Sequence, residues 1–306
     1  MEFTPIKALD QPWTARTFAT LVILAVVVPG GGLVLAWAFL RRFLPYVNAE
    51  QLKRIAQVLL LAFGLQACAT RVDLPEGIRF QQPDTPPAAQ LIRVSAADLQ
   101  PGDILLTSMP GAIGASIELL TVSPVSHAAI YLGDGRIAEA LRPAVRTRTL
   151  ETVMLEESEA LVLRYPDLTE AQAKRIVRYA QDRMGDRFNY VGVTLQIPVV
   201  LGRRACELPL VPGVVRDACI RTLGALNPLA SSDERLFCSQ LVLEAYRQAG
   251  VPLLEADASL VNPADILHMR EGDVPSFRIT VPLQYVGHLK NLRKPLERAP
   301  LMAAQF

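Results

Sequence analysis

The feature that most constrains this chain is an uncharged apolar run near its start. Residues 18–40 contain no Asp, Glu, Lys or Arg, and they are flanked by Arg16, Arg41 and Arg42. A helix of about 20 apolar residues crosses the hydrocarbon of a bilayer, so this run predicts a membrane span. Pro29 and the glycines after it interrupt a regular helix, and a re-entrant hairpin is therefore the alternative.

A second apolar stretch, residues 55–67, follows Lys53 and Arg54 and leads into Cys68. This layout is typical of a secretory signal. The last four residues, Leu-Gln-Ala-Cys, resemble a bacterial lipobox, in which the cysteine carries a lipid after everything before it is removed. Gln66 stands where that motif has a small residue, so a second membrane helix with an incidental cysteine is the alternative.

The basic residues around these runs predict an orientation. Arg41, Arg42, Lys53 and Arg54 precede the second run, and the positive-inside bias then sends the chain after Cys68 out of the cytoplasm. We therefore expect a membrane-anchored protein whose remaining domain lies on the periplasmic side.

Composition limits what that domain can be. The chain has 306 residues, with 31 basic and 30 acidic side chains and a net charge of +1. Its mean hydropathy of +0.26 is high for a soluble protein, and the apolar excess lies in residues 1–68. Without an extended basic cluster the chain has no electrostatic footprint for nucleic acid, which is therefore not an expected partner.

The distribution of residues predicts three segments. Residues 1–68 would form the anchor, and the proline-rich residues 69–90 a tether between membrane and domain. Residues 91–306 are enough for one catalytic domain with a single core. Within it, residues 191–230 show no clear periodicity and are interpreted as an insertion over the core.

Apolar periodicity and turn residues predict the elements of the domain. A capping box, Thr169 with Gln172, opens one of the helices. The predicted strands are 103–107, 128–132, 136–141, 161–164 and 278–283, and the predicted helices are 112–120, 169–184 and 238–249.

A hairpin around Gly-Asp-Gly carries two candidate site residues, His127 and Glu139. A three-residue turn sets Glu139 opposite Ala129, diagonal to His127 and on the same face, where a carboxylate can orient the imidazole. A two-residue turn would move Glu139 to the other face. Asp134 and Glu151 are therefore alternatives for the third member of the site.

Cys238 opens a predicted helix, which places its sulfur at the positive end of the helix dipole. That position lowers a thiol pKa, and a neighbouring imidazolium lowers it further. The backbone N–H of Cys238 is free at the helix terminus and can donate to an oxyanion. Cys238 as nucleophile, His127 as general base and Glu139 as orienting carboxylate therefore form a candidate catalytic triad.

Three blocks carry a resemblance to a known family: residues 99–105 (LQPGDIL), 126–135 (SHAAIYLGDG) and 237–242 (FCSQLV). In this order they resemble the permuted NlpC-type papain-like cysteine hydrolases of the YiiX/YaeF-like group, over roughly residues 91–250. The resemblance implies an α+β, circularly permuted papain-like fold, with helices packed on a central antiparallel sheet. It also implies the same three catalytic residues, no cofactor, and cleavage of a peptide or aminoacyl amide through a thioester.

The same resemblance leaves two other functions open. Permuted relatives of the retinol-acyltransferase type, which also place His before Cys, suggest a lipid acyl hydrolase or acyltransferase. Phe-Cys-Ser-Gln differs from the Asn-Cys-Glu-His of that branch, whereas an apolar insertion beside a membrane anchor favours it. A catalytically silent module that binds peptide or lipid is the third possibility. Some members of the family are lipoproteins, in agreement with a lipid on Cys68.

The remaining cysteines and histidines have structural interpretations. Cys206 and Cys219 could form a disulfide in an oxidising compartment. With three histidines and no C-x-x-C spacing, the chain has no sequence support for a metal site. His288 follows Cys238 in the forward papain order but lacks a paired hairpin, and His268 is expected at a surface helix end.

Overall fold

The structure is a computed structural model that describes residues 70–73, 77–82, 84–86, 91–189, 200, 202–203, 206–207, 213–225 and 235–291. These residues all belong to one compact unit within residues 65–306. In this described part no helix is long and apolar enough to cross a membrane. The predicted span 18–40, the second apolar run 55–67 and Cys68 lie outside the described residues.

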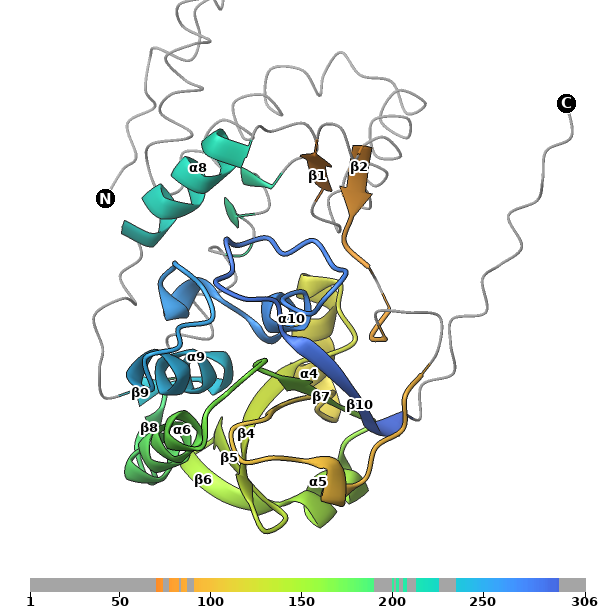
Figure 1. Ribbon diagram of the computed structural model, residues 1–306, viewed down its shortest axis with the longest axis vertical. Helices are drawn as coiled ribbons and strands as arrows, with labels where there is room; N and C mark the ends of the chain where they lie inside the picture. Colours follow the sequence, from red (N-terminus) through yellow and green to blue (C-terminus); the bar gives the residue numbers. More distant parts are fainter. Residues whose placement is uncertain are drawn as a thin grey trace, which may run out of the picture. The chain divides into compact units, whose positions relative to one another are not determined.

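An eight-stranded sheet forms the centre of the domain (Figure 1). Its neighbouring strands are antiparallel except for the last pair, which is parallel. The strands in spatial order are β10 (Gln284–Asn291), β7 (Glu159–Arg164), β3 (Ile104–Thr107), β4 (His127–Gly133), β5 (Arg136–Leu141), β6 (Ala144–Thr149), β8 (Arg187–Phe188) and β9 (Arg235–Leu236).

Helices connect and cover these strands. The described α-helices are α4 (Gly111–Thr121), α5 (Leu150–Glu156), α6 (Glu170–Asp182), α8 (Gly213–Ala225), α9 (Cys238–Gln248) and α10 (Pro263–Leu267). Two 3₁₀ turns, η3 (Ala96–Asp98) and η4 (Ala258–Leu260), and a separate hairpin of β1 (Thr70–Asp73) and β2 (Gly77–Phe80) complete the described elements.

The alternation of side chains along the strands builds one core on each face of the sheet. Helices α9 and α6 lie side by side and cover one face of the central strands (Figure 1). Strand residues such as Ala128 and Ile130 pack there against Leu241 of α9. The other face carries Ala129 and neighbouring apolar residues, which pack against α5.

Most predicted elements are present, and the α+β antiparallel architecture is confirmed. The Thr169 capping box is formed, with the hydroxyl accepting from the backbone N–H of Gln172. The predicted strand 278–283 is wrong: only isolated bridges occur at Ile279 and Leu283, and the strand begins at Gln284. Strand β6 was missing from the sequence-based prediction.

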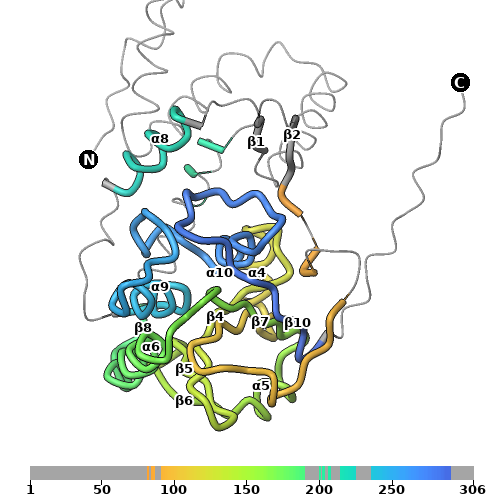
Figure 2. The backbone as a smooth tube through the Cα atoms, viewed as in Figure 1, coloured from red at the N-terminus to blue at the C-terminus, as the bar shows by residue number. Residues whose placement is uncertain are grey.

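Part of the segment predicted as a tether contacts the domain. The fully buried guanidinium of Arg270 donates to the backbone oxygens of Asp84 and Thr85, at 2.6 Å each. The Thr85 hydroxyl in turn donates to Glu159 at 2.6 Å. The segment that begins at residue 91 runs alongside β10 (Figure 2). Within it, Arg93 forms an isolated β-bridge with His288 of β10. The amino-terminal edge of the domain is therefore held by buried polar contacts.

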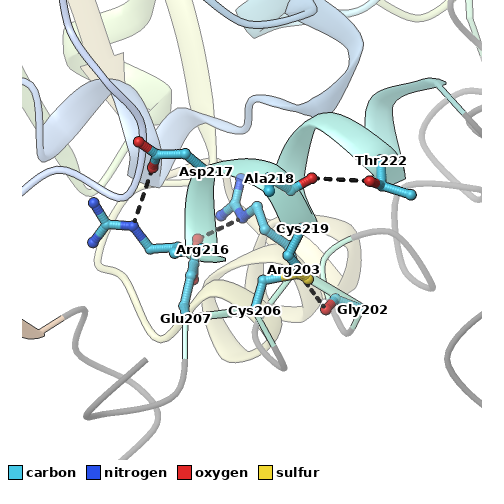
Figure 3. The surroundings of a disulfide bond; sticks show 9 residues. All are labelled: Gly202, Arg203, Cys206, Glu207, Arg216, Asp217, Ala218, Cys219 and Thr222. Atoms are coloured by element: carbon cyan, nitrogen blue, oxygen red, sulfur yellow. Dashed lines mark hydrogen bonds and ion pairs between the residues drawn. A yellow bond between two sulfur atoms is a disulfide. The ribbon is translucent and has the colours of Figure 1, made fainter. Parts of the chain in front are cut away.

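The described part of the predicted insertion contains a disulfide between Cys206 and Cys219, which joins α8 to the residues before it (Figure 3). Beside it, the buried Arg203 contacts Glu207 at 3.0 Å. Arg203 also forms a two-pronged ion pair with Asp265 of α10, at 2.7 Å from each guanidinium nitrogen. Such paired bonds fix geometry as well as contributing energy. The insertion is thus attached to α10 by a buried charge pair.

Candidate active site

His127 and Glu139 lie on the same face of the β4–β5 hairpin. Ile130 pairs with Ala138, and continuing this register sets Glu139 opposite Ala129. This is the register that the sequence predicted from a three-residue turn. It places the two side chains diagonally across the pair, within reach of a direct hydrogen bond.

The turn itself differs from the predicted one. Gly133 pairs with Arg136, so only Asp134 and Gly135 connect the strands. Both have positive φ, as a tight hairpin turn requires. A register shift between Tyr131 and Gly133 supplies the missing residue as a β-bulge. A two-residue turn with a bulge therefore places the side chain of Glu139 on the same face of the hairpin as a three-residue turn would.

The imidazole of His127 bonds through Nε2 to Oε2 of Glu139, at 3.0 Å. Both side chains are buried, with exposed fractions of 2% and 0%. Burial alone would raise the pKa of Glu139, but the bond and charge of His127 and the charge of Arg148 outweigh it and lower that pKa to about 2. Glu139 is therefore a carboxylate at neutral pH and can hold a protonated imidazole.

Two arginines of β6 complete the surroundings of Glu139. Arg146 Nε donates to Oε1 at 2.9 Å, and Arg148 Nε lies 3.5 Å from the same oxygen. Arg148 also bonds to Glu156 at 3.1 Å and to the buried Glu157 at 2.7 Å. Sequence reasoning missed these residues because it missed the strand, although the alternating Val-Arg-Thr-Arg-Thr was a usable signal.

Cys238 is the first residue of α9 and is partly exposed. Its sulfur is hydrogen-bonded to the His127 side chain and accepts hydrogen bonds from the backbone N–H groups of Ala128 and Ser239. Burial alone would raise the thiol pKa, but the bond and charge of His127 outweigh it and lower that pKa below its usual value. Because Nε2 of His127 is occupied by Glu139, Nδ1 is the nitrogen left for the sulfur.

The pKa of His127 moves in the opposite direction. Burial by itself would lower it, yet the bonds to Cys238 and Glu139 and their charges raise it above the ordinary value. A lowered thiol pKa beside a raised imidazole pKa favours a thiolate–imidazolium pair at neutral pH. Such a pair is the reactive form of a cysteine nucleophile.

A cavity of about 880 Å³ opens onto the thiol and the imidazole. Cys238 and His127 lie in its wall, together with Arg146 and Arg148. The α4 helix contributes an apolar side that includes Ile113, Ile117 and Leu120. A ligand in this cavity would therefore meet the thiol between a charged region and an apolar region.

The other candidates lie elsewhere. Asp134 and Glu151, the alternatives to Glu139, are exposed. His288 is buried on β10 and contacts Glu159 at 3.2 Å. The expectation that His268 lies at the surface is wrong, because it is buried at the end of α10 and bonds to Asp273 at 2.6 Å. Within the described residues, no group of three or more His, Cys, Asp or Glu side chains could hold a metal ion.

The chain is similar to a known protein family, to a curated protein and to a solved structure. Residues 98–193 match the family described as "Permuted papain-like amidase enzyme, YaeF/YiiX, C92 family". The chain is 36% identical to the "Probable lipoprotein peptidase YaeF" of Escherichia coli strain K12, over 72% of this chain and 83% of that protein. A crystal structure of the metalloprotein YiiX from Escherichia coli O157:H7 aligns with a TM-score of 0.36 and 18% identity, covering 61% of this chain and 96% of that one.

A cysteine at the start of a helix, paired with an imidazole on an antiparallel strand that precedes that helix in the chain, defines a permuted papain-like cysteine hydrolase. The chain belongs to the permuted papain-like amidase family of YaeF and YiiX. It is accordingly a papain-like cysteine amidase or peptidase.

The low pKa of Glu139 predicts a specific acid sensitivity. Since the folded pKa of about 2 lies below the ordinary value of 4.5, its contribution is present above pH 4.5 and is lost as the pH falls toward 2. The free energy of unfolding, measured with urea at pH 5 and pH 2.5, should fall less in Glu139→Gln than in the wild type. We expect a difference on the order of 2 kcal/mol between the two decreases. Equal decreases would mean that Glu139 titrates normally.

Proposed function

We propose that this chain is a membrane-tethered cysteine amidase that cleaves a peptide or aminoacyl amide through a thioester on Cys238. The observation that carries the proposal is a thiol of lowered pKa beside an imidazole in the wall of one cavity, with the buried carboxylate of Glu139 hydrogen-bonded to that imidazole. Membership in an amidase family supports the bond type and speaks against a silent binding module.

Each residue has a role in this reaction. The Cys238 thiolate attacks the carbonyl carbon, and the His127 imidazolium gives its proton to the departing amine. A thioester remains on Cys238. Water, deprotonated by His127, then attacks the thioester carbonyl and restores the thiol as the acid leaves. Glu139 keeps the ring oriented and stabilises its charged form in both steps.

The tether and the compartment belong to the same proposal. The uncharged run 18–40 and the lipobox-like sequence before Cys68 support attachment to a membrane. The relative YaeF carries the word lipoprotein in its name. A disulfide between Cys206 and Cys219 supports an oxidising compartment, since disulfides persist outside the reducing cytosol. The domain would therefore work on the periplasmic side of a membrane.

A test of the amidase function uses the full-length chain in detergent. Aminoacyl p-nitroanilides and short cell-wall peptides are offered, and the protein is quenched in acid for mass spectrometry of the peptide that contains Cys238. We expect p-nitroaniline or shorter peptides as products, together with an acyl adduct on Cys238. Cys238→Ala provides the background. Absence of both turnover and adduct across the panel would contradict an amidase.

The apolar side of the cavity favours a second candidate, hydrolysis or transfer of a lipid acyl group. Ile113 lines the cavity and is 48% exposed, and Leu119 and Val122 of the same region are exposed outside the cavity lining. An acyl chain could lie along such a surface while its carbonyl reaches Cys238. Faster acylation by p-nitrophenyl palmitate than by p-nitrophenyl acetate, beyond their difference in the Cys238→Ala background, would favour this alternative over amide cleavage.

A further inference from the structure

Asn262 lies in the wall of the catalytic cavity but has no role in the triad. It precedes α10 as its N-cap and is 3% exposed. Its Oδ1 accepts from the backbone N–H of Asp265 at 3.0 Å, and its own backbone N–H donates to the Asp265 carboxylate at 2.8 Å. The orientation of the side-chain amide is therefore determined, because only an oxygen can face the N–H of Asp265.

Two contacts fix Asn262 beside the nucleophile. Ser239, which follows Cys238, donates its hydroxyl proton to the backbone oxygen of Val261 at 2.6 Å. This bond joins the first turn of α9 to the residue before Asn262. On the other side, Arg203 holds Asp265 through its two-pronged ion pair. The position of Asn262 is thus set by contacts to the start of α9 on one side and to the start of α10 on the other.

The Nδ2 group of Asn262 remains without a partner. No residue in the described ranges accepts a hydrogen bond from it, and Nδ2 is not among the enclosed side-chain atoms that lack a partner, so it reaches the open space of the cavity. An amide donor in the wall of a catalytic cavity, with its oxygen already bonded to Asp265, is available to a substrate oxygen.

We propose that Asn262 Nδ2 and the backbone N–H of Cys238 together form the oxyanion hole of the proposed amidase. The backbone N–H lies at the first position of α9, where no helical acceptor exists. When the thiolate adds to the carbonyl carbon, the carbonyl π electrons move onto oxygen, and two fixed donors stabilise that charge. This inference rests on the proposed function, since it assigns a group that binds the transition state of acyl transfer.

Neighbouring donors are already committed. The Ser239 hydroxyl donates to the backbone oxygen of Val261, and the Ser239 backbone N–H donates to the sulfur of Cys238. The backbone N–H of Ala128 also points to that sulfur. The amide of Asn262 is therefore a side-chain donor in the cavity wall that no described residue already uses.

The test compares two reactions of Cys238 in the full-length protein. Acylation by p-nitrophenyl acetate passes through a tetrahedral oxyanion: sulfur bonds to the carbonyl carbon, the ester C–O bond breaks and p-nitrophenolate leaves. Alkylation by iodoacetamide displaces iodide and develops no oxyanion. Asn262→Ser keeps an N-cap oxygen but removes the amide donor. We expect this variant to lose about 10²-fold in the acylation rate constant and less than twofold in the alkylation rate constant.

A second variant and the wild type make the outcomes distinct. Asn262→Ala removes both the cap and the donor, and it should acylate as slowly as Asn262→Ser; Cys238→Ala again gives the background. Full acylation by Asn262→Ser, with a loss confined to Asn262→Ala, would show that Asn262 only caps α10. Equal losses in acylation and alkylation would show that it acts on the thiolate instead. A wild-type Cys238 that reacts with neither reagent would contradict both the proposed function and this inference.

Discussion

His127→Ala is expected to change the pH dependence of Cys238 alkylation from nearly flat to steeply rising. In the wild type the imidazolium keeps the thiol ionised, because it lowers the thiol pKa through a hydrogen bond and its charge. Without it, burial is the largest remaining influence and raises the thiol pKa to about 8.5 or above, which leaves at most roughly 0.3% thiolate at pH 6. A thiolate of low pKa is intrinsically less nucleophilic, so the alkylation rate at pH 6 should fall by less than the thiolate fraction does.

The same substitution should have a larger effect on turnover. Loss of His127 removes the charge that ionises the thiol, the acid for the leaving amine and the base for water. We expect amide hydrolysis to fall by at least about 10³-fold. Alkylation is followed between pH 5.5 and 9 by mass spectrometry of the peptide that contains Cys238, with circular dichroism as the folding control. A variant whose alkylation stays flat over this range would exclude a Cys238–His127 ion pair.

Glu139→Gln is expected to lower amide hydrolysis by about 10²- to 10³-fold without removing the imidazole. The amide oxygen of glutamine can still accept from Nε2 of His127, but the negative charge that stabilises the imidazolium is lost. The pKa of His127 should then fall, and that of Cys238 should rise. Alkylation of this variant should therefore lie between the wild type and His127→Ala across the pH range.

Glu151→Gln is the matched control, because Glu151 is exposed and lies outside the catalytic cavity. It should leave turnover and the alkylation profile within a factor of two of the wild type. Glu139 also pairs with Arg146 and Arg148, so Glu139→Gln is compared at a temperature where circular dichroism shows it folded. Wild-type turnover in folded Glu139→Gln would mean that the carboxylate is structural only.

Local patterns were enough to predict the central part of the fold. The strand that begins at His127, its return at Arg136 and the helix that begins at Cys238 follow from short-range periodicity and turn residues. Each of these signals lies within about 20 residues of sequence, so it needs no knowledge of distant partners. The three quoted motif blocks depend on the same local sequence, which is why they identified the family.

Long-range pairing could not be predicted in the same way. Strand β10 pairs with β7, more than 100 residues earlier, and its start at Gln284 follows from that pairing. The predicted strand 278–283 contains Pro282, which has no N–H to donate to a ladder. His268 was expected at the surface because it stands at a predicted helix end beside Met269 and Arg270, yet the carboxylate of Asp273 makes its burial possible.

The sequence by itself determined the types and order of the reactive groups: a thiol at a helix start, an imidazole at a strand start and a carboxylate on the returning strand. The tertiary structure decided how they are oriented and surrounded. The bulge before Gly133 sets the face of Glu139, Arg146 and Arg148 fix its charge, and Asn262 comes to the cavity from another segment. Residue type and helix position are properties of a short segment, whereas burial, pKa and the direction of a side-chain donor depend on groups that only folding brings together.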